Sequence, residues 1–150
     1  MVAQKKKESV KAKVKSLDIK NYAILKVAYD LPDEHVNPIL IIRKMAEHLE
    51  LYLKIVQQIL QPEEFSALYE CAAFDDVEKK KLLELYKTCI VIHRELLKCE
   101  IIADDAVTSK CIEKVHSQIQ SVKPDMLKIV QKMQDSWGHI TKKDVVKYFG

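Results

Sequence analysis

Glycine and proline are scarce in this 150-residue chain, which has 2 glycines and 4 prolines. Sandwiches and barrels need many tight turns, and these two residue types are preferred in such turns. A Gly-rich phosphate-binding loop also needs more glycine than Gly138 and Gly150 can supply. The scarcity therefore favours a few long helices over a sheet, and it argues against a nucleotide-binding loop.

Arginine and long apolar runs are scarce as well. Arg43 and Arg94 are the only arginines, whereas specific base or phosphate recognition usually uses the planar arginine fork. The longest apolar runs, such as residues 39–42, have about four residues, and a membrane span needs about 18. The N-terminus also lacks the apolar core of a signal peptide. We therefore expect a cytoplasmic protein without a membrane span.

Two segments carry long apolar seams with helical spacing, which alternates steps of three and four residues. The seam of residues 38–60 comprises Ile42, Met45, Leu49, Tyr52, Val56 and Ile59. The seam of residues 76–103 comprises Leu82, Leu85, Cys89, Ile92, Leu96 and Cys99, and it is widened by Leu83, Tyr86, Ile90, His93, Leu97 and Ile101. We predict two long core helices, of which the second is central. Asp75 and Glu78 have the spacing of a capping box at its start.

Shorter helices are predicted in the rest of the chain. Their expected ranges are 18–30, 62–74, 106–122, 124–137 and a last short helix at 141–149. Lys123-Pro124 is expected to separate two of them, because proline disfavours the helical conformation of the residue before it. In the helix after this break, the predicted inward face is Leu127, Val130, Met133 and Trp137. The sequence thus predicts an all-α fold, an antiparallel helical bundle of about six helices.

A basic arm precedes this bundle. Residues 1–15 hold six lysines against the single acidic residue Glu8, a net charge of +5, whereas the remainder is slightly acidic. The lysines are Lys5, Lys6, Lys7, Lys11, Lys13 and Lys15. They are candidates for binding a polyanion such as nucleic acid, although such arms are also often only solubilising. We assign residues 1–17 to a frayed or helical arm and residues 18–150 to one helical-bundle domain.

Four cysteines are scattered along the chain and none forms a CxxC motif. They are Cys71, Cys89, Cys99 and Cys111. Cys89 and Cys99 lie on the apolar seam, where a free cysteine behaves as a small hydrophobic residue. We expect reduced thiols and no structural disulfide.

Cys89 and His93 are the candidate metal ligands, because residues four apart share one helix face. A site would need further ligands from another helix, for example Cys111, His116 or Cys71. The alternative is that both residues pack in the core. Glu113 and His116 have the Glu-x-x-His spacing of di-iron bundles, but a second such step is missing. We expect neither a metal nor a cofactor.

No nucleophile–base arrangement is recognisable, so no catalytic residue is assigned. The two long seams have the rhythm of coiled coils, and the width of the second leaves apolar surface for another helix. We predict a non-enzymatic interaction or scaffold module that self-associates, as a dimer, or binds a partner helix. One alternative is a nucleic-acid-associated protein that uses the lysine-rich arm. Another is a metal-binding helical bundle or an enzyme.

Overall fold

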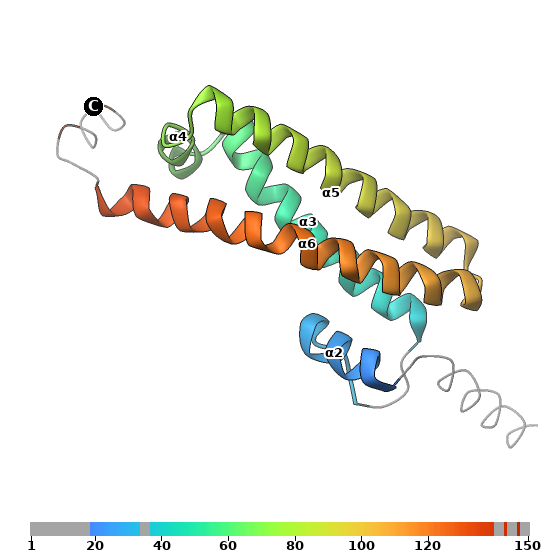
Figure 1. Ribbon diagram of the computed structural model, residues 1–150. Coiled ribbons are helices and arrows are strands. Elements are labelled where there is room, and N and C mark those ends of the chain that lie inside the picture. Colours follow the sequence, from blue (N-terminus) through green and yellow to red (C-terminus); the bar gives the residue numbers. More distant parts are fainter. Residues whose placement is uncertain (1–18, 34–36, 140–142, 144–146, 148–150) are drawn as a thin grey trace, which may run out of the picture. The chain divides into compact units, whose positions relative to one another are not determined.

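The computed structural model describes residues 19–33, 37–139, 143 and 147. These residues form five α-helices and no strand (Figure 1). The helices are α2 (Ile19–Tyr29), α3 (Pro38–Leu60), α4 (Phe65–Cys71), α5 (Asp76–Ile102) and α6 (Asp105–Gly138). The all-α prediction and the two long helices at 38–60 and 76–103 are confirmed. The basic arm and the predicted last helix lie outside the described residues, apart from Lys143 and Lys147.

The chain divides into two compact units. Unit 1 consists of residues 1–48 and 92–118, and unit 2 consists of residues 49–91 and 119–150. Each of α3, α5 and α6 contributes one stretch to each unit. The assignment of residues 18–150 to one domain stays a prediction.

Side-chain caps lie at the starts of α3, α5 and α6. The backbone N–H of Glu78 donates to Asp75 Oδ1 at 2.8 Å, and the backbone N–H of Asp75 donates to Glu78 Oε2 at 2.9 Å. This reciprocal pair is the capping box expected at the start of α5. Asn37 Oδ1 accepts from the N–H of Ile39 at 3.0 Å, and Asp104 Oδ1 accepts from the N–H of Val107 at 2.9 Å. The caps satisfy backbone donors that lack a partner within the helix.

Two helices end on a residue with positive φ. Asp30 follows α2 with φ 50°, and Ala103 follows α5 with φ 54°. The N–H of Leu31 donates to the carbonyl of Lys26 at 3.1 Å, and the N–H of Ala103 donates to the carbonyl of Cys99 at 3.0 Å. These bonds satisfy carbonyls at the helix ends. The link from α5 to α6 consequently needs only two residues.

The core of unit 1 is formed by α2, the start of α3, the end of α5 and the start of α6. Within this unit the end of α5 and the start of α6 run antiparallel (Figure 1). Its most buried side chains include Ile41, Ile42, Met45, Ile92, Leu96, Ile112 and Val115. Arg43 Nε also donates to Glu100 Oε1 at 2.7 Å, which links α3 to α5 at the surface.

The core of unit 2 uses the end of α3, α4, the start of α5 and the end of α6. Its buried side chains include Leu49, Val56, Ile59, Leu82, Cys89, Ile119, Val122 and Met126. Helix α4 is tied to the end of α6, since the Tyr69 hydroxyl donates to the Ser136 carbonyl at 3.0 Å. Trp137 Nε1 donates to Glu70 Oε1 at 2.7 Å, and its ring centroid lies 4.5 Å from that of Tyr69. These bonds hold the short helix against the end of the long one.

The predicted break at Lys123-Pro124 is wrong, because α6 continues through Pro124. A proline inside a helix removes one hydrogen bond and costs about 3 kcal/mol. Pro124 is exposed, and buried residues precede and follow it in one continuous seam. The seam consists of Ile119, Val122, Met126 and Ile129. Burial of this seam offsets the cost of the proline, and the count of described helices falls to five.

The inward face predicted for residues 124–137 is therefore also partly wrong. Leu127 is 62% exposed and Val130 is 43% exposed, while Met126 and Ile129 are buried. Because the helix is unbroken, the phase of its buried stripe is set by Val122, and Met126 lies four residues further on the same face. The predicted break at Pro124 disconnected the buried stripe of residues 124–137 from Val122, so the predicted stripe was displaced by one residue. Leu127 and Val130 thus remain on the surface.

Candidate functional site

A groove of about 770 Å³ lies in unit 2, between the start of α5 and the end of α6. Its floor is apolar and is formed by Leu82, Leu85, Val122 and Ile129. Its rim is polar and consists of Glu78, Lys80, Lys81, Glu84, Thr88, Ser121, Asp125, Lys128 and Lys132. The long lysine side chains add aliphatic surface above the floor. An apolar floor with a charged rim is typical of a groove that binds a helix.

The rim carries both charge signs on each side. On the α6 side, Lys132 pairs with Glu78 across the groove and also lies 5.1 Å from the centre of the Phe74 ring. The Lys132 hydrogen bond, followed by the bond from the Asp75 backbone, lowers the pKa of Glu78. Lys128 lies 4.0 Å from Asp125 on the same helix. The rim therefore combines acidic and basic side chains.

The same two helices also carry exposed apolar side chains that are not part of the groove lining. Leu83 on α5 is 43% exposed, as is Val130 on α6, and Leu127 is 62% exposed. Because a helix turns by about 100° per residue, Leu127 and Val130 project from the side of α6 that faces away from the groove-lining residues. The sequence predicts Leu83 and Leu127 as core residues, and their exposure adds to the apolar surface that unit 2 offers.

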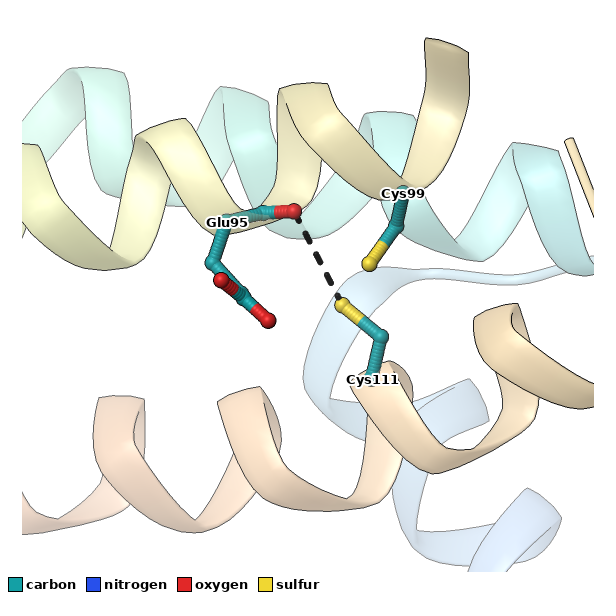
Figure 2. A group of neighbouring side chains, drawn as sticks. All are labelled: Glu95, Cys99 and Cys111. Carbon is teal, nitrogen blue, oxygen red and sulfur yellow. Dashed lines mark hydrogen bonds between the residues drawn. The ribbon is translucent and has the colours of Figure 1, made fainter. Parts of the chain in front are cut away.

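A second cluster lies in unit 1, where Glu95, Cys99 and Cys111 approach one another (Figure 2). One ligand atom from each residue, a carboxylate oxygen or a sulfur, lies within 4.8 Å of the others. Glu95 and Cys99 are one turn apart on α5, and Cys111 lies opposite on α6. Figure 2 shows the two sulfur atoms pointing toward one another between the helices. Cys111 Sγ also lies 4.0 Å from the backbone carbonyl oxygen of Glu95.

Burial governs the chemistry of the cysteines. It raises the pKa of Cys111 to about 12, with a further contribution from the hydrogen bond to Cys99. Burial likewise raises the pKa of Cys89 to about 11. Both thiols are protonated at neutral pH in the metal-free protein, so neither is an activated nucleophile. All four cysteines are free thiols.

A histidine–tyrosine cluster in unit 1 is a third group of polar side chains. The Tyr29 hydroxyl lies 3.0 Å from His116 Nδ1. The Tyr29 ring also contacts His48 edge-on, with 5.7 Å between the ring centres. Burial lowers the pKa of His116. Glu113 and His116 line a small pocket of about 220 Å³ beside Leu25, so this Glu-x-x-His step faces α2.

Of the metal-ligand candidates that the sequence singles out, the structure places Cys111 in a cluster and the leading pair, Cys89 and His93, outside it. Cys89 and His93 are both buried on α5, one turn apart. Among the described residues, the cluster of three or more metal-binding side chains is Glu95, Cys99 and Cys111, and neither Cys89 nor His93 belongs to it. The lysines at positions 5–15 lie outside the described residues. The role of Cys89 and His93 as candidate metal ligands stays a prediction.

The Glu95 cluster is missed by sequence reasoning, although a signal for it exists. Glu95 and Cys99 have the same four-residue spacing as Cys89 and His93. A hairpin about the link at residues 103–104 brings the end of α5 next to the start of α6, and so places Cys111 near them. Recognising the hairpin partner of Cys99 would have identified the group.

No family model matches the chain, and neither a curated protein nor a solved structure matches it significantly. Within the described residues, every helix is too short or too polar to cross a membrane. The function is therefore inferred from the groove and the side-chain clusters themselves.

Proposed function

We propose that the protein is a non-enzymatic interaction module that self-associates through the α5–α6 groove of unit 2. The observation that carries this proposal is the groove itself, with its apolar floor and its charged rim. An amphipathic helix fits such a site, because its apolar stripe meets the floor while its polar flanks meet the rim. The occupant that we propose is α6 of a second copy.

Two features favour a second copy over an unrelated helix. A head-to-tail interface joins two different patches of the same chain, one that offers a cavity and one that fills it. The groove provides the cavity, and the exposed Leu127 and Val130, on the other side of α6, provide the apolar groups that enter the groove of the next copy. The rim carries both charge signs, so that lysines of one copy can oppose acidic residues of the other.

Light scattering coupled to size exclusion tests this proposal over a range of protein concentrations. The wild-type protein is expected to form a dimer and larger oligomers, whose population rises with concentration. Leu127→Glu places a charge on the exposed side of α6 that we propose enters the groove of another copy. Because Leu127 is 62% exposed, the substitution is not expected to disturb the fold of the subunit. We expect this change to weaken self-association at least tenfold, which corresponds to about 1.4 kcal/mol.

Leu51→Glu is the matched control, because Leu51 is an α3 residue of unit 2, is 54% exposed and does not line the groove. It should leave self-association intact. A wild-type protein that stays monomeric up to about 100 μM would contradict the proposal, since a micromolar Kd would be saturated there. Equal weakening by Leu127→Glu and Leu51→Glu would also contradict it.

The lysine-rich arm supports a second candidate, the binding of a polyanion such as nucleic acid. Six lysines within residues 5–15 can neutralise several phosphates, and such binding weakens steeply as salt rises. Electrophoretic shift of a duplex at low and high salt, with and without residues 1–15, is the test. Binding that survives removal of these residues would contradict the candidate.

A further inference from the structure

We propose that Glu95, Cys99 and Cys111 form a zinc-binding site in unit 1, with the two cysteine sulfurs and the glutamate carboxylate as ligands. The site is separate from the α5–α6 groove and does not depend on self-association. It combines two soft ligands and one hard ligand, a set that zinc accepts in proteins.

The geometry of the three side chains suits a single ion. Two sulfurs bound to one tetrahedral zinc at about 2.3 Å lie about 3.8 Å apart. The ligand atoms of the cluster already lie within 4.8 Å of one another, so side-chain rotation suffices to close them around an ion. Glu95 and Cys99 project from one face of α5 toward Cys111 (Figure 2). Both backbones are helical, which places the ligands on rigid elements.

The three proposed ligands differ in burial. Cys99 and Cys111 are 3% and 5% exposed, whereas the Glu95 side chain is 34% exposed. The sulfurs are therefore shielded from bulk solvent, while the carboxylate is partly exposed to it. Water can complete the coordination on this exposed side. Each thiol gives its proton to solvent when the ion binds, and the ion then compensates the two buried thiolate charges.

The charge around the cluster is consistent with one dication. Lys114 Nζ lies 3.7 Å from Glu95 Oε1, so a lysine faces the carboxylate beside the two thiols. Two thiolates and one carboxylate carry three negative charges, and zinc together with Lys114 supplies three positive charges. Zinc therefore neutralises the cluster, whereas two thiolates without an ion would be buried and uncompensated.

Cobalt(II) titration of the full chain tests the site, with a phosphine reductant present to keep the thiols reduced. Tetrahedral cobalt bound to thiolate absorbs in the near ultraviolet through sulfur-to-metal charge transfer. We expect this band to saturate at one equivalent and to disappear when zinc is added. Cys99→Ser and Cys111→Ser should each remove the band, and Glu95→Gln should weaken zinc binding by about tenfold or more.

Cys89→Ser and Cys71→Ser are the controls, since one removes a buried cysteine and the other a partly exposed one, both in unit 2. Both should keep the band. Because a serine in the core can impair folding, circular dichroism is compared, and the shift in Tm on zinc addition is measured for the wild type and for the partly exposed Glu95→Gln. Absence of the band in the wild-type protein, its retention in Cys111→Ser or an unchanged wild-type Tm would overturn the proposal.

Discussion

At the scale of single residues, Ala103 occupies a backbone conformation that favours glycine. Its φ of 54° lies in the left-handed region, where an L-residue with a Cβ is strained by about 1–2 kcal/mol. Ala103 is exposed and follows the last turn of α5. We expect Ala103→Gly to raise the free energy of unfolding by up to about 1 kcal/mol, because removal of the Cβ strain exceeds the added entropy of the unfolded chain.

Urea unfolding measures this change, and Ala23→Gly is the matched control. Ala23 is also exposed but lies inside α2, where glycine is expected to lower the stability by about 1 kcal/mol. A loss of stability in both variants would show that residue 103 does not adopt the left-handed conformation.

His116 makes stability depend on pH. Burial lowers its pKa in the folded protein, so the unfolded chain binds more protons as the pH falls through about 6.5, the ordinary pKa of histidine. Stability should therefore be full at neutral pH and decrease below it. We expect the urea concentration at the unfolding midpoint to be lower at about pH 5.5 than at about pH 7.5. The difference should be smaller in His116→Gln. His139→Gln, which alters an exposed histidine, should keep the wild-type slope.

At the scale of helices, the boundaries were predictable wherever a cap fixes them. The capping box of Asp75 and Glu78 places the start of α5 from sequence alone. The continuity of α6 was not predictable in this way, because the local conformational preference at Pro124 and the packing of the residues after it favour different structures. Local rules predict a break there, whereas burial of Met126 and Ile129 favours continuity. Tertiary packing prevails, and sequence spacing gives no measure of its strength.

Pro124→Ala tests the continuity of α6. If the helix is unbroken, alanine supplies the missing N–H group and removes the clash of the proline ring with the preceding turn. We therefore expect the free energy of unfolding to rise by at least about 1 kcal/mol, measured by urea denaturation. A broken helix would instead give no change or a loss, because proline restricts the unfolded chain.

At the scale of the whole molecule, the sequence was sufficient for the all-α class but not for the division into two units. The seams of α3 and α5 have the same spacing along their whole length, and nothing in that spacing indicates that residues 48 and 91 are points of division. The same limit of sequence spacing applies to the candidate clusters. Residues that share a helix, such as Glu95 and Cys99, can be paired from spacing, whereas Cys111 joins them only through the hairpin.

Because α3, α5 and α6 each contribute to both units, we expect the units to unfold together. Leu96→Ala removes a fully buried side chain of unit 1 and should cost about 2–5 kcal/mol. Trp137 is the only tryptophan and belongs to unit 2. The urea midpoint reported by its fluorescence should therefore fall as far as the midpoint reported by circular dichroism. A tryptophan transition that Leu96→Ala does not move would contradict this coupling.

The two-residue connection after Ile102 has a consequence for biosynthesis. The entropic cost of closing a loop grows with its length, and few residues separate Cys99 from Cys111. A growing polypeptide can bring both sulfurs together soon after position 111 leaves the ribosome, before the end of α6 has been made. Metal capture at this hairpin can then be among the earliest events in the life of the protein, and it would not have to wait for assembly with another copy.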